Sequence, residues 1–173
     1  MSRNLLFVVP FLLWFWTSIS DPVLAQDAVE SQINQQVWKV FKSSYEQGDW
    51  KTFNSLHTDE VLRISRSGIR VGKEYRSSNR QSFERAGRRK LKIDFAFENR
   101  TYKNNVGYET GFYRVIYSAT EKQKSSTHYG RFHVLLRRSG DKWLIAQDWD
   151  NSEFNGKPID ASDFDKAKLL KLD

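Results

Sequence analysis

The residues best suited to chemistry lie on two segments near the C-terminal end that are predicted to be neighbouring strands. His133 lies in the first segment and Asp148 in the second. If the carboxylate of Asp148 orients the imidazole of His133, the pair forms a general base for water or for a ligand hydroxyl. Alternatively, Asp148 pairs with Arg131 in a cross-strand salt bridge on the outer face of a sheet, which would be purely structural.

A second group of residues combines aromatic rings with cationic groups and is predicted to bind a ligand. Arg131 and His133 are two residues apart on one predicted strand, so they share a face with Tyr129. Phe132 and Val134 point the opposite way. An aromatic rim above a wall of arginine and histidine would suit a flat, partly anionic small molecule. The candidate ligand-binding residues are Trp38, Tyr45, Arg63, Tyr113, Tyr129, Arg131 and Trp149.

The histidines and cysteines predict no metal centre. The chain has no cysteine, which excludes disulfides, thiolate zinc sites and cysteine nucleophiles. His128 and His133 are five residues apart on one predicted strand, so they face opposite sides and cannot share an ion. His57 falls between a predicted helix and a strand, where we expect it to cap the helix end. We therefore expect neither a metal nor a cofactor.

Length and charge limit the possible classes of protein. The chain has 173 residues, a length typical of one domain, and 39% are hydrophobic, which is enough for a core and excludes wholesale disorder. The formal net charge is +7, but the charges are spread widely, as on a solvated surface. Because no recognition motif accompanies the basic residues, we expect no nucleic acid among the partners. The densest basic cluster is Arg85, Arg88, Arg89, Lys90 and Lys92, at a predicted helix end.

Residues 1–25 have the three-part layout of a secretory signal peptide. Arg3 gives a basic start, an apolar run covers residues 5–16, and Ala25 ends a small-x-small cleavage pattern. The alternative is an uncleaved membrane anchor, but the apolar run has 12 residues and a spanning helix needs about 20. The sequence therefore predicts an exported protein, periplasmic or secreted, without stable membrane insertion after cleavage.

The first part of the remaining chain is predicted to be mainly helical. Apolar residues at spacings of three and four predict a helix from Val29 to Tyr45, which Gly48 ends. Asp49 is expected to cap a second, short helix. A strand over residues 61–65 and a third helix over residues 73–86 follow.

The rest of the chain alternates polar and apolar residues and predicts four long strands joined mostly by hairpins. Helices followed by an antiparallel meander predict an α+β fold, in which three helices pack on the concave face of a cone-shaped, mostly antiparallel sheet. The residues after Asn155 are expected to form a polar tail with a short helix near residues 164–172. The last long strand is expected to present Trp143, Ile145, Gln147 and Trp149 on one face.

The order of these elements, together with several local strings, resembles the nuclear transport factor 2-like superfamily, in particular its SnoaL-like and ketosteroid-isomerase-like branch in bacteria. The resemblance covers about residues 28–152, and it implies one domain over residues 26–155 followed by a tail over residues 156–173. The strings are Trp38-x-x-Phe41, Tyr45-Glu46-Gln47-Gly48-Asp49-Trp50, Leu56-His57-Thr58-Asp59-Glu60-Val61, Gly72, Gly111-Phe112-Tyr113, Gly130-Arg131-Phe132 and Gly140-Asp141-Lys142-Trp143-Leu144-Ile145.

The resemblance implies a pocket at the wide end of the cone and a homodimer, often formed through the outer face of the sheet. It does not imply isomerase chemistry, because the expected tyrosine and base positions fall near Phe41 and Ser65, and the expected acid falls near His133. We therefore expect an exported protein that binds an unidentified small molecule. The alternatives are an isomerase, hydratase or hydrolase that uses His133 and Asp148, and a structural dimerisation module with a filled pocket.

Overall fold

The computed structural model describes residues 22–86, 90–118, 124–170 and 172, and for residues 22–25 only the backbone is described. The helices are α1 (Pro22–Ile33), the π-helical turn η1 (Asn34–Trp38), α2 (Lys39–Gln47), α3 (Trp50–Ser55), α4 (Gly72–Ala86) and α5 (Ala161–Lys166). The strands are β1 (His57–Ser65), β2 (Gly68–Val71), β3 (Leu91–Lys103), β4 (Val106–Tyr117), β5 (Ser126–Ser139), β6 (Lys142–Asn151), β7 (Glu153–Phe154), β8 (Lys157–Pro158) and β9 (Lys168–Leu169). Residues 1–21 of the predicted signal peptide, and residues 88 and 89 of the basic cluster, lie outside the described residues.

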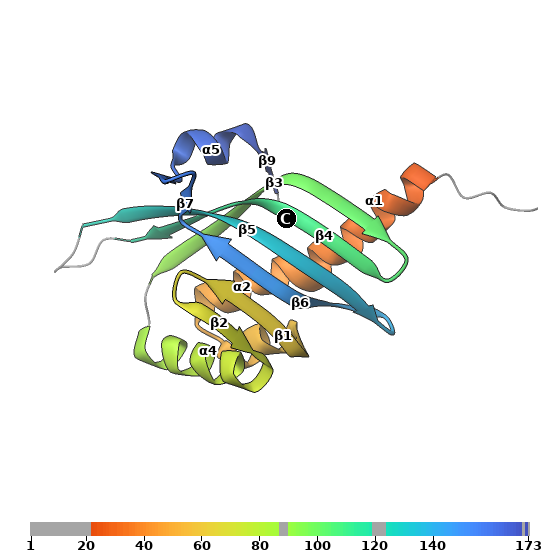
Figure 1. Ribbon diagram of the computed structural model, residues 1–173, viewed down its shortest axis with the longest axis horizontal. Coiled ribbons are helices and arrows are strands. Elements are labelled where there is room, and N and C mark those ends of the chain that lie inside the picture. Colours follow the sequence, from red (N-terminus) through yellow and green to blue (C-terminus); the bar gives the residue numbers. More distant parts are fainter. Residues whose placement is uncertain (1–21, 87–89, 119–123, 171, 173) are drawn as a thin grey trace, which may run out of the picture.

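The main sheet has seven strands in the order β2-β1-β6-β5-β4-β3-β9 and is curved and unclosed (Figure 1). All neighbouring strands are antiparallel except β1 and β6, which are parallel. The α+β cone predicted from the sequence is therefore confirmed. Strand β2 was not predicted, because four residues are too few to show an alternating pattern.

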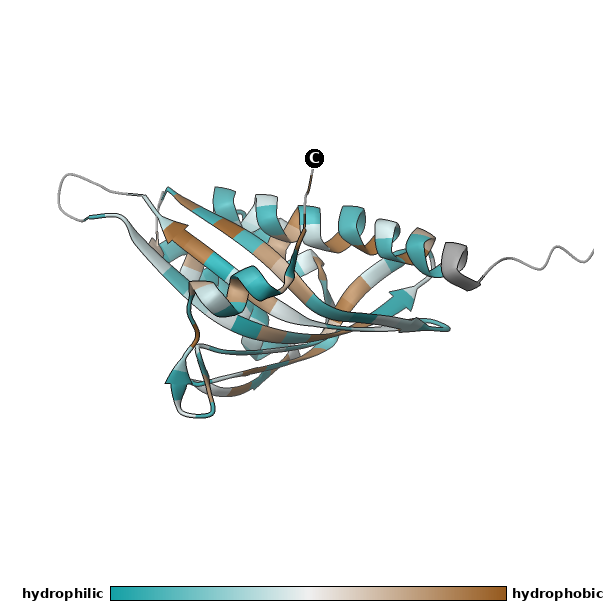
Figure 2. Cartoon of the chain, turned by 90° about the horizontal axis from the view of Figure 1, so that it is seen from above, coloured by the Kyte–Doolittle hydropathy of each residue, from teal (hydrophilic) through white to brown (hydrophobic). Residues whose placement is uncertain are grey.

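Helices α1 to α4 pack against the concave side of this sheet, whereas α5 lies against its outer face. Helices α1 and α2 are joined through η1 and run as one long rod along the sheet, with hydrophobic and hydrophilic residues interspersed along it (Figure 2). Gly48, with φ 73°, ends α2 in the left-handed region that glycine adopts without strain. The side chain of Asp49 accepts hydrogen bonds from the backbone N–H groups of Lys51 and Thr52, which confirms it as the cap of α3. No helix in the described ranges is both long and apolar enough to cross a membrane.

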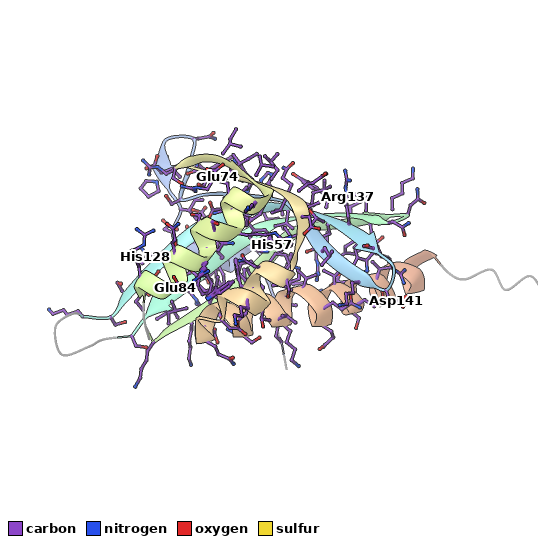
Figure 3. All side chains as sticks on the ribbon, turned by 90° about the horizontal axis from the view of Figure 1, so that it is seen from below. His57, Glu74, Glu84, His128, Arg137 and Asp141 are labelled. Atoms are coloured by element: carbon purple, nitrogen blue, oxygen red, sulfur yellow. The ribbon has the colours of Figure 1, made fainter. Side chains whose placement is uncertain are left out.

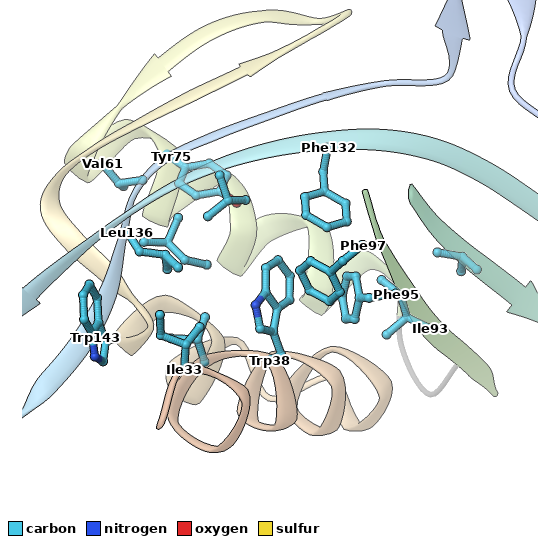
Figure 4. Close-up of a cluster of buried hydrophobic side chains, with 14 residues drawn as sticks. Ile33, Trp38, Val61, Tyr75, Ile93, Phe95, Phe97, Phe132, Leu136 and Trp143 are labelled. Atoms are coloured by element: carbon cyan, nitrogen blue, oxygen red, sulfur yellow. The ribbon is translucent and has the colours of Figure 1, made fainter. Parts of the chain in front are cut away.

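The core lies between the helical rod and the sheet, and Trp38 is at its centre (Figure 4). Its indole ring lies 4.7 Å from the ring of Phe95 and 5.1 Å from that of Phe97, measured between centroids. Phe132 lies 5.2 Å from it on the neighbouring strand β5. Such tilted and edge contacts between rings are the arrangements that aromatic side chains favour. They fix Trp38 as part of the wall between helix and sheet.

The C-terminal segment, expected as a polar tail with a short helix, lies against the outer face of the sheet. Asp160 and Asp163 form a capping box at the start of α5. Phe164 is only 3% exposed and packs with Ala96 and Phe112. Strand β9 then pairs with β3 and covers what would otherwise be an open sheet edge.

Candidate functional site

A cavity of about 290 Å³ opens on the concave side of the sheet, at the lower end of the size range of small-molecule sites. Helices α2, α3 and α4 form one side of it and strands β1 and β3–β6 form the other. Aromatic and aliphatic side chains form just over half of its lining, and serines, an asparagine and charged groups form the rest. The rings come from Trp38, Phe41, Tyr45, Phe53, Tyr75 and Phe83 on the helices and from Phe95, Tyr113 and Phe132 on the sheet.

One wall of the cavity carries an arginine between two aspartates. Arg63 Nη1 lies 2.8 Å from Asp148 Oδ1, and Arg63 Nη2 donates to Asp150 Oδ1 at 2.6 Å. Asp150 is the most accessible of the three, with 23% of its side chain exposed against 17% for Arg63 and 11% for Asp148. These groups therefore form a nearly buried ionic cluster that faces the cavity.

The surroundings of this cluster change the pKa values of its members. Burial raises the pKa of the Asp148 carboxyl, and the positive charge of Arg63 only partly offsets this. Burial alone would lower the pKa of Arg63, but the two carboxylates outweigh it and hold the guanidinium charged. Asp148 is thus a carboxyl group that binds a proton more readily than an exposed aspartate does.

Two tyrosines also donate hydrogen bonds to the aspartates. The hydroxyl of Tyr75 donates to Asp148 Oδ2 at 3.4 Å, and that of Tyr113 donates to Asp150 Oδ2 at 3.1 Å. Burial raises the pKa of both phenols, so both stay protonated donors at neutral pH. Tyr45, on the opposite wall, has its pKa raised to about 12, mainly by burial.

A bulge in β6 turns the two aspartates towards the cavity. Leu136 pairs with Ile145, but the next pair is Leu135 with Gln147, so Ala146 is an extra residue in β6. One extra residue reverses which side chains face inward, because side chains alternate along a strand. Trp143, Ile145, Gln147 and Trp149 therefore do not share a face, and that expectation is wrong. The bulge keeps the first two in the core and brings Asp148 and Asp150 inward.

The predicted pair of His133 and Asp148 is not formed. His133 lies on the outer face, where its Nδ1 is 2.8 Å from the hydroxyl of Tyr108 and its ring lies 4.7 Å from that of Trp149. Asp148 lies on the inner face with Arg63. The sheet separates the two side chains, so Asp148 cannot orient His133 as a base.

The seven predicted ligand-binding residues divide between the two faces of the sheet. Four of them line the cavity: Trp38, Tyr45, Arg63 and Tyr113. On the outer face, Tyr129 packs against Phe164, and Arg131 pairs with Glu98 at 2.9 Å. Trp149 lies there too, beside His133. Arg131 lies on the outer face because side chains alternate along β5 and the neighbouring apolar Phe132 lies in the core.

Tyr75 and Asp150 are part of the site although sequence reasoning did not select them. Asp150 is two residues after Asp148 on a strand, and this spacing was the available signal that both face one side. Tyr75 falls in the helix predicted over residues 73–86, and it lines the cavity with Asn79 and Phe83, which follow at four-residue spacing. Phe41 and Ser65, the positions where the isomerase pattern has its tyrosine and its base, also line the cavity. The carboxylates of this cavity come from β6 and not from the position of Ser65 on β1.

The histidines lie outside this cavity. His57 is buried under α4, whereas His128 lies near an outlying end of β5 (Figure 3). The Nδ1 of His57 donates to the backbone oxygen of Phe53 at 3.0 Å, so it caps the end of α3 as expected. Burial lowers the pKa of His57 to about 4, which keeps its ring neutral. Within the described ranges, no three His, Cys, Asp or Glu side chains are grouped so that they could hold a metal ion.

Comparison with known proteins identifies the fold. Neither a protein-family model nor a curated protein matches this sequence. A candidate dehydratase of the NTF2-like (nuclear transport factor 2-like) family from Streptomyces avermitilis is 14% identical, and the match covers 79% of this chain and 99% of that one with a TM-score of 0.61. An NTF2-like protein of unknown function from Pseudomonas putida is 16% identical, with coverages of 78% and 96% and a TM-score of 0.61.

A candidate aromatic ring hydroxylase from Novosphingobium aromaticivorans is also similar, at 12% identity, with coverages of 76% and 91% and a TM-score of 0.57. Identities this low show a shared fold and nothing about activity. The chain therefore has the NTF2-like fold, and the resemblance read from its sequence is confirmed at that level.

Proposed function

We propose that this protein binds a small molecule of one or two rings in the cavity on the concave side of its sheet. The observation that carries the proposal is the combination of about 290 Å³ of aromatic-walled space with one ionic cluster at its wall. Small-molecule sites typically combine mainly apolar walls with a few polar groups that fix orientation. The cavity is not filled by Trp38 or Phe41, which argues against a purely structural module.

Two neighbouring serines on α4 allow a matched test of this proposal. Ser78 lines the cavity, whereas Ser77 is exposed and does not. We expect single-ring compounds detected by ligand-observed NMR to lose binding in Ser78→Phe, because the new ring fills the space. Ser77→Phe should bind them as the wild type does. Binding that Ser78→Phe leaves unchanged would show that the compounds bind elsewhere.

Acid–base catalysis is a second candidate function, favoured by the pKa of Asp148. A buried carboxyl with a raised pKa can hold a proton and donate it to a leaving hydroxyl, as a hydration or dehydration reaction requires. The fold supports the enzyme alternative in this form, with Asp148 and Asp150 in place of the pair with His133. If the protein is such an enzyme, Asp148→Asn abolishes turnover and leaves binding of the substrate measurable. Equal turnover in that variant would exclude this role.

We also propose that the chain is exported, because of the signal-peptide layout of residues 1–25. N-terminal sequencing of protein recovered from outside the cytoplasm should begin at Gln26. Recovery of a chain that still begins at Met1, in the cytoplasm, would contradict export.

We further propose a homodimer that uses the outer face of the sheet. This face presents exposed apolar side chains, among them Ile69 at 65% and Tyr108 at 42% exposure. Sedimentation should report a dimer that Ile69→Lys converts to a monomer. A wild-type chain that sediments as a monomer would contradict this proposal.

A further inference from the structure

The ionic cluster of the cavity has more hydrogen-bond acceptors than donors. Each of the four carboxylate oxygens of Asp148 and Asp150 receives one hydrogen bond or ion-pair contact, from Arg63, Tyr75 or Tyr113. An ionised carboxylate has about four acceptor positions in all. About half of the acceptor capacity of this wall is therefore unused, and the free capacity lies beside the cavity.

Within the cluster the charge is also unbalanced, although Arg70 brings the charged residues that line the cavity to two arginines and two aspartates. One guanidinium, that of Arg63, lies between two carboxylates, so the cluster carries a net charge of −1 when both are ionised. Arg63 is therefore not free to bind an anion. Arg70 also lines the cavity. It is the register partner of Arg63 on the edge strand β2, whereas Asp148 is the partner of Arg63 on the other side, in β6. Arg70 donates a hydrogen bond to Ser67 in the hairpin turn. Its charge is more open to screening by solvent.

The walls around the cluster suit a cation better than an anion. Aromatic faces carry a negative quadrupole that attracts ammonium groups, and this attraction strengthens when the cation is removed from water. Tyr113 donates to Asp150, and Tyr45 lines the same space. The flat, partly anionic ligand expected from the sequence depended on Arg131 and His133 facing inward, and both face outward.

We propose that the ligand of this cavity is a compound with one ring and a protonated amine, whose ammonium group binds at Asp150. This proposal rests on the proposed binding function and names the chemical class of the ligand. An ammonium group carries three N–H donors and no acceptor, which matches a wall whose carboxylates have unused acceptor capacity. Asp150 is the contact because its side chain is the more exposed of the two carboxylates.

Asp148 adds a dependence on pH. Its pKa is raised by burial, so it takes up a proton at a higher pH than an exposed aspartate does. A bound ammonium favours the ionised carboxylate and releases that proton. Affinity for the amine should therefore rise with pH through the titration of Asp148 and then level off. The other charged groups that line the cavity are Arg63, Arg70 and Asp150, and the hydroxyl of Tyr75 contacts Asp148 directly.

The experiment compares three probes that share a phenyl ring and differ in the end group: 2-phenylethylamine, 2-phenylethanol and 3-phenylpropanoate. Titration calorimetry at pH 7 should give the amine an affinity about tenfold or more above that of the alcohol, which corresponds to one favourable ionic contact. The carboxylate should bind most weakly. An alcohol or carboxylate that binds as tightly as the amine overturns the proposal.

Variants separate this proposal from the more general one. Asp150→Asn should lower the affinity for the amine about tenfold and change that for the alcohol little. Asp94→Asn is the matched control, because Asp94 is also ion-paired but outside the cavity. If the alcohol or carboxylate binds best and Ser78→Phe abolishes that binding, the cavity is a binding site and only the proposal of an amine ligand is contradicted. If none of the three probes binds, or Ser78→Phe changes nothing, both proposals fail. The selectivity of the wild type decides the matter even if Asp150→Asn does not fold.

Discussion

Gly130 lies directly beneath the phenol ring of Tyr113, so close that a Cβ at position 130 would be 2.3 Å from Tyr113 Cζ. The two residues are register partners on β5 and β4. The absence of a side chain at Gly130 lets the ring lie over the neighbouring strand and reach Asp150. Gly130 thus makes room for a side chain of the site.

We therefore predict that Gly130→Ala displaces Tyr113. The overpacking should lower the free energy of unfolding by about 1–3 kcal/mol, measured by urea denaturation. The same variant should weaken binding of any cavity ligand, because the displaced Tyr113 is part of the cavity wall. In a Tyr113→Ala background the ring is absent, so Gly130→Ala should cost clearly less. Equal costs in the two backgrounds would show that the ring is not the cause.

The sequence predicted the fold better than the site, and β6 shows why. The order of helices and strands follows from local patterns, such as the Asp49 cap and the alternation of apolar residues in β5. The face of Asp148 depends on the bulge at Ala146, which is visible only once β6 pairs with its neighbours. Arg131 and His133 flank Phe132 on the same strand, so their side chains point to the face opposite to that of Phe132. Because an apolar phenylalanine is expected in the core, this alternation already predicted that Arg131 and His133 point outward, away from the cavity.

His57 should make the stability depend on pH. In the unfolded chain a histidine takes up a proton with a pKa of about 6.5, whereas burial lowers the pKa of folded His57 to about 4. Stability from the neutral ring is therefore complete above about pH 6.5 and is lost as the pH falls towards 4, by about 3 kcal/mol in all. The protonated ring is disfavoured in the folded state because Nε2 is buried with no hydrogen-bond partner among the described residues. Urea denaturation from pH 4 to 8 measures the loss.

Two variants check this assignment. His57→Phe should remove most of the pH dependence between 6.5 and 4. His128→Phe should keep it, because His128 is exposed on β5. A His57→Phe variant that follows the wild-type curve would assign the dependence to another group.

Glu109 should contribute far more to stability than a comparable carboxylate near the surface. It is fully buried and accepts hydrogen bonds from Trp38 at 2.6 Å, Tyr102 at 2.6 Å, and Arg100 at 2.7 and 2.9 Å. Glu109→Gln leaves Arg100 with less compensation and adds a buried amide N–H₂ among donors. We expect a loss of about 3–5 kcal/mol.

The matched control for this prediction is Glu98→Gln. Glu98 pairs with Arg131 on the outer face and keeps 30% of its side chain exposed, so its loss should cost about 1 kcal/mol or less. Both values come from urea denaturation. Similar losses in the two variants would show that the buried hydrogen-bond network does not depend on the negative charge of Glu109.

Arg63 separates the contribution of the ionic cluster to stability from its contribution to binding. Arg63→Gln leaves two carboxylates at the cavity wall without a cation, which should cost about 3–5 kcal/mol at pH 7. Without Arg63, only the hydrogen bond from Tyr75 still offsets the burial that raises the pKa of Asp148. The folded variant then holds a proton that the unfolded chain releases near its ordinary carboxyl pKa. Its stability is therefore highest in acid and is lost as the pH rises through and above that value.

The triple variant Arg63→Gln, Asp148→Asn and Asp150→Asn should regain most of the lost stability and should not show this pH dependence. Replacing a buried ionic group by neutral residues is often neutral or stabilising, because the charges no longer have to be removed from water. If the triple variant is as stable as the wild type but no longer binds 2-phenylethylamine, the cluster contributes to binding at no net gain in stability. A single Arg63→Gln variant with wild-type stability at pH 7 would instead show that solvent in the cavity already screens the two carboxylates.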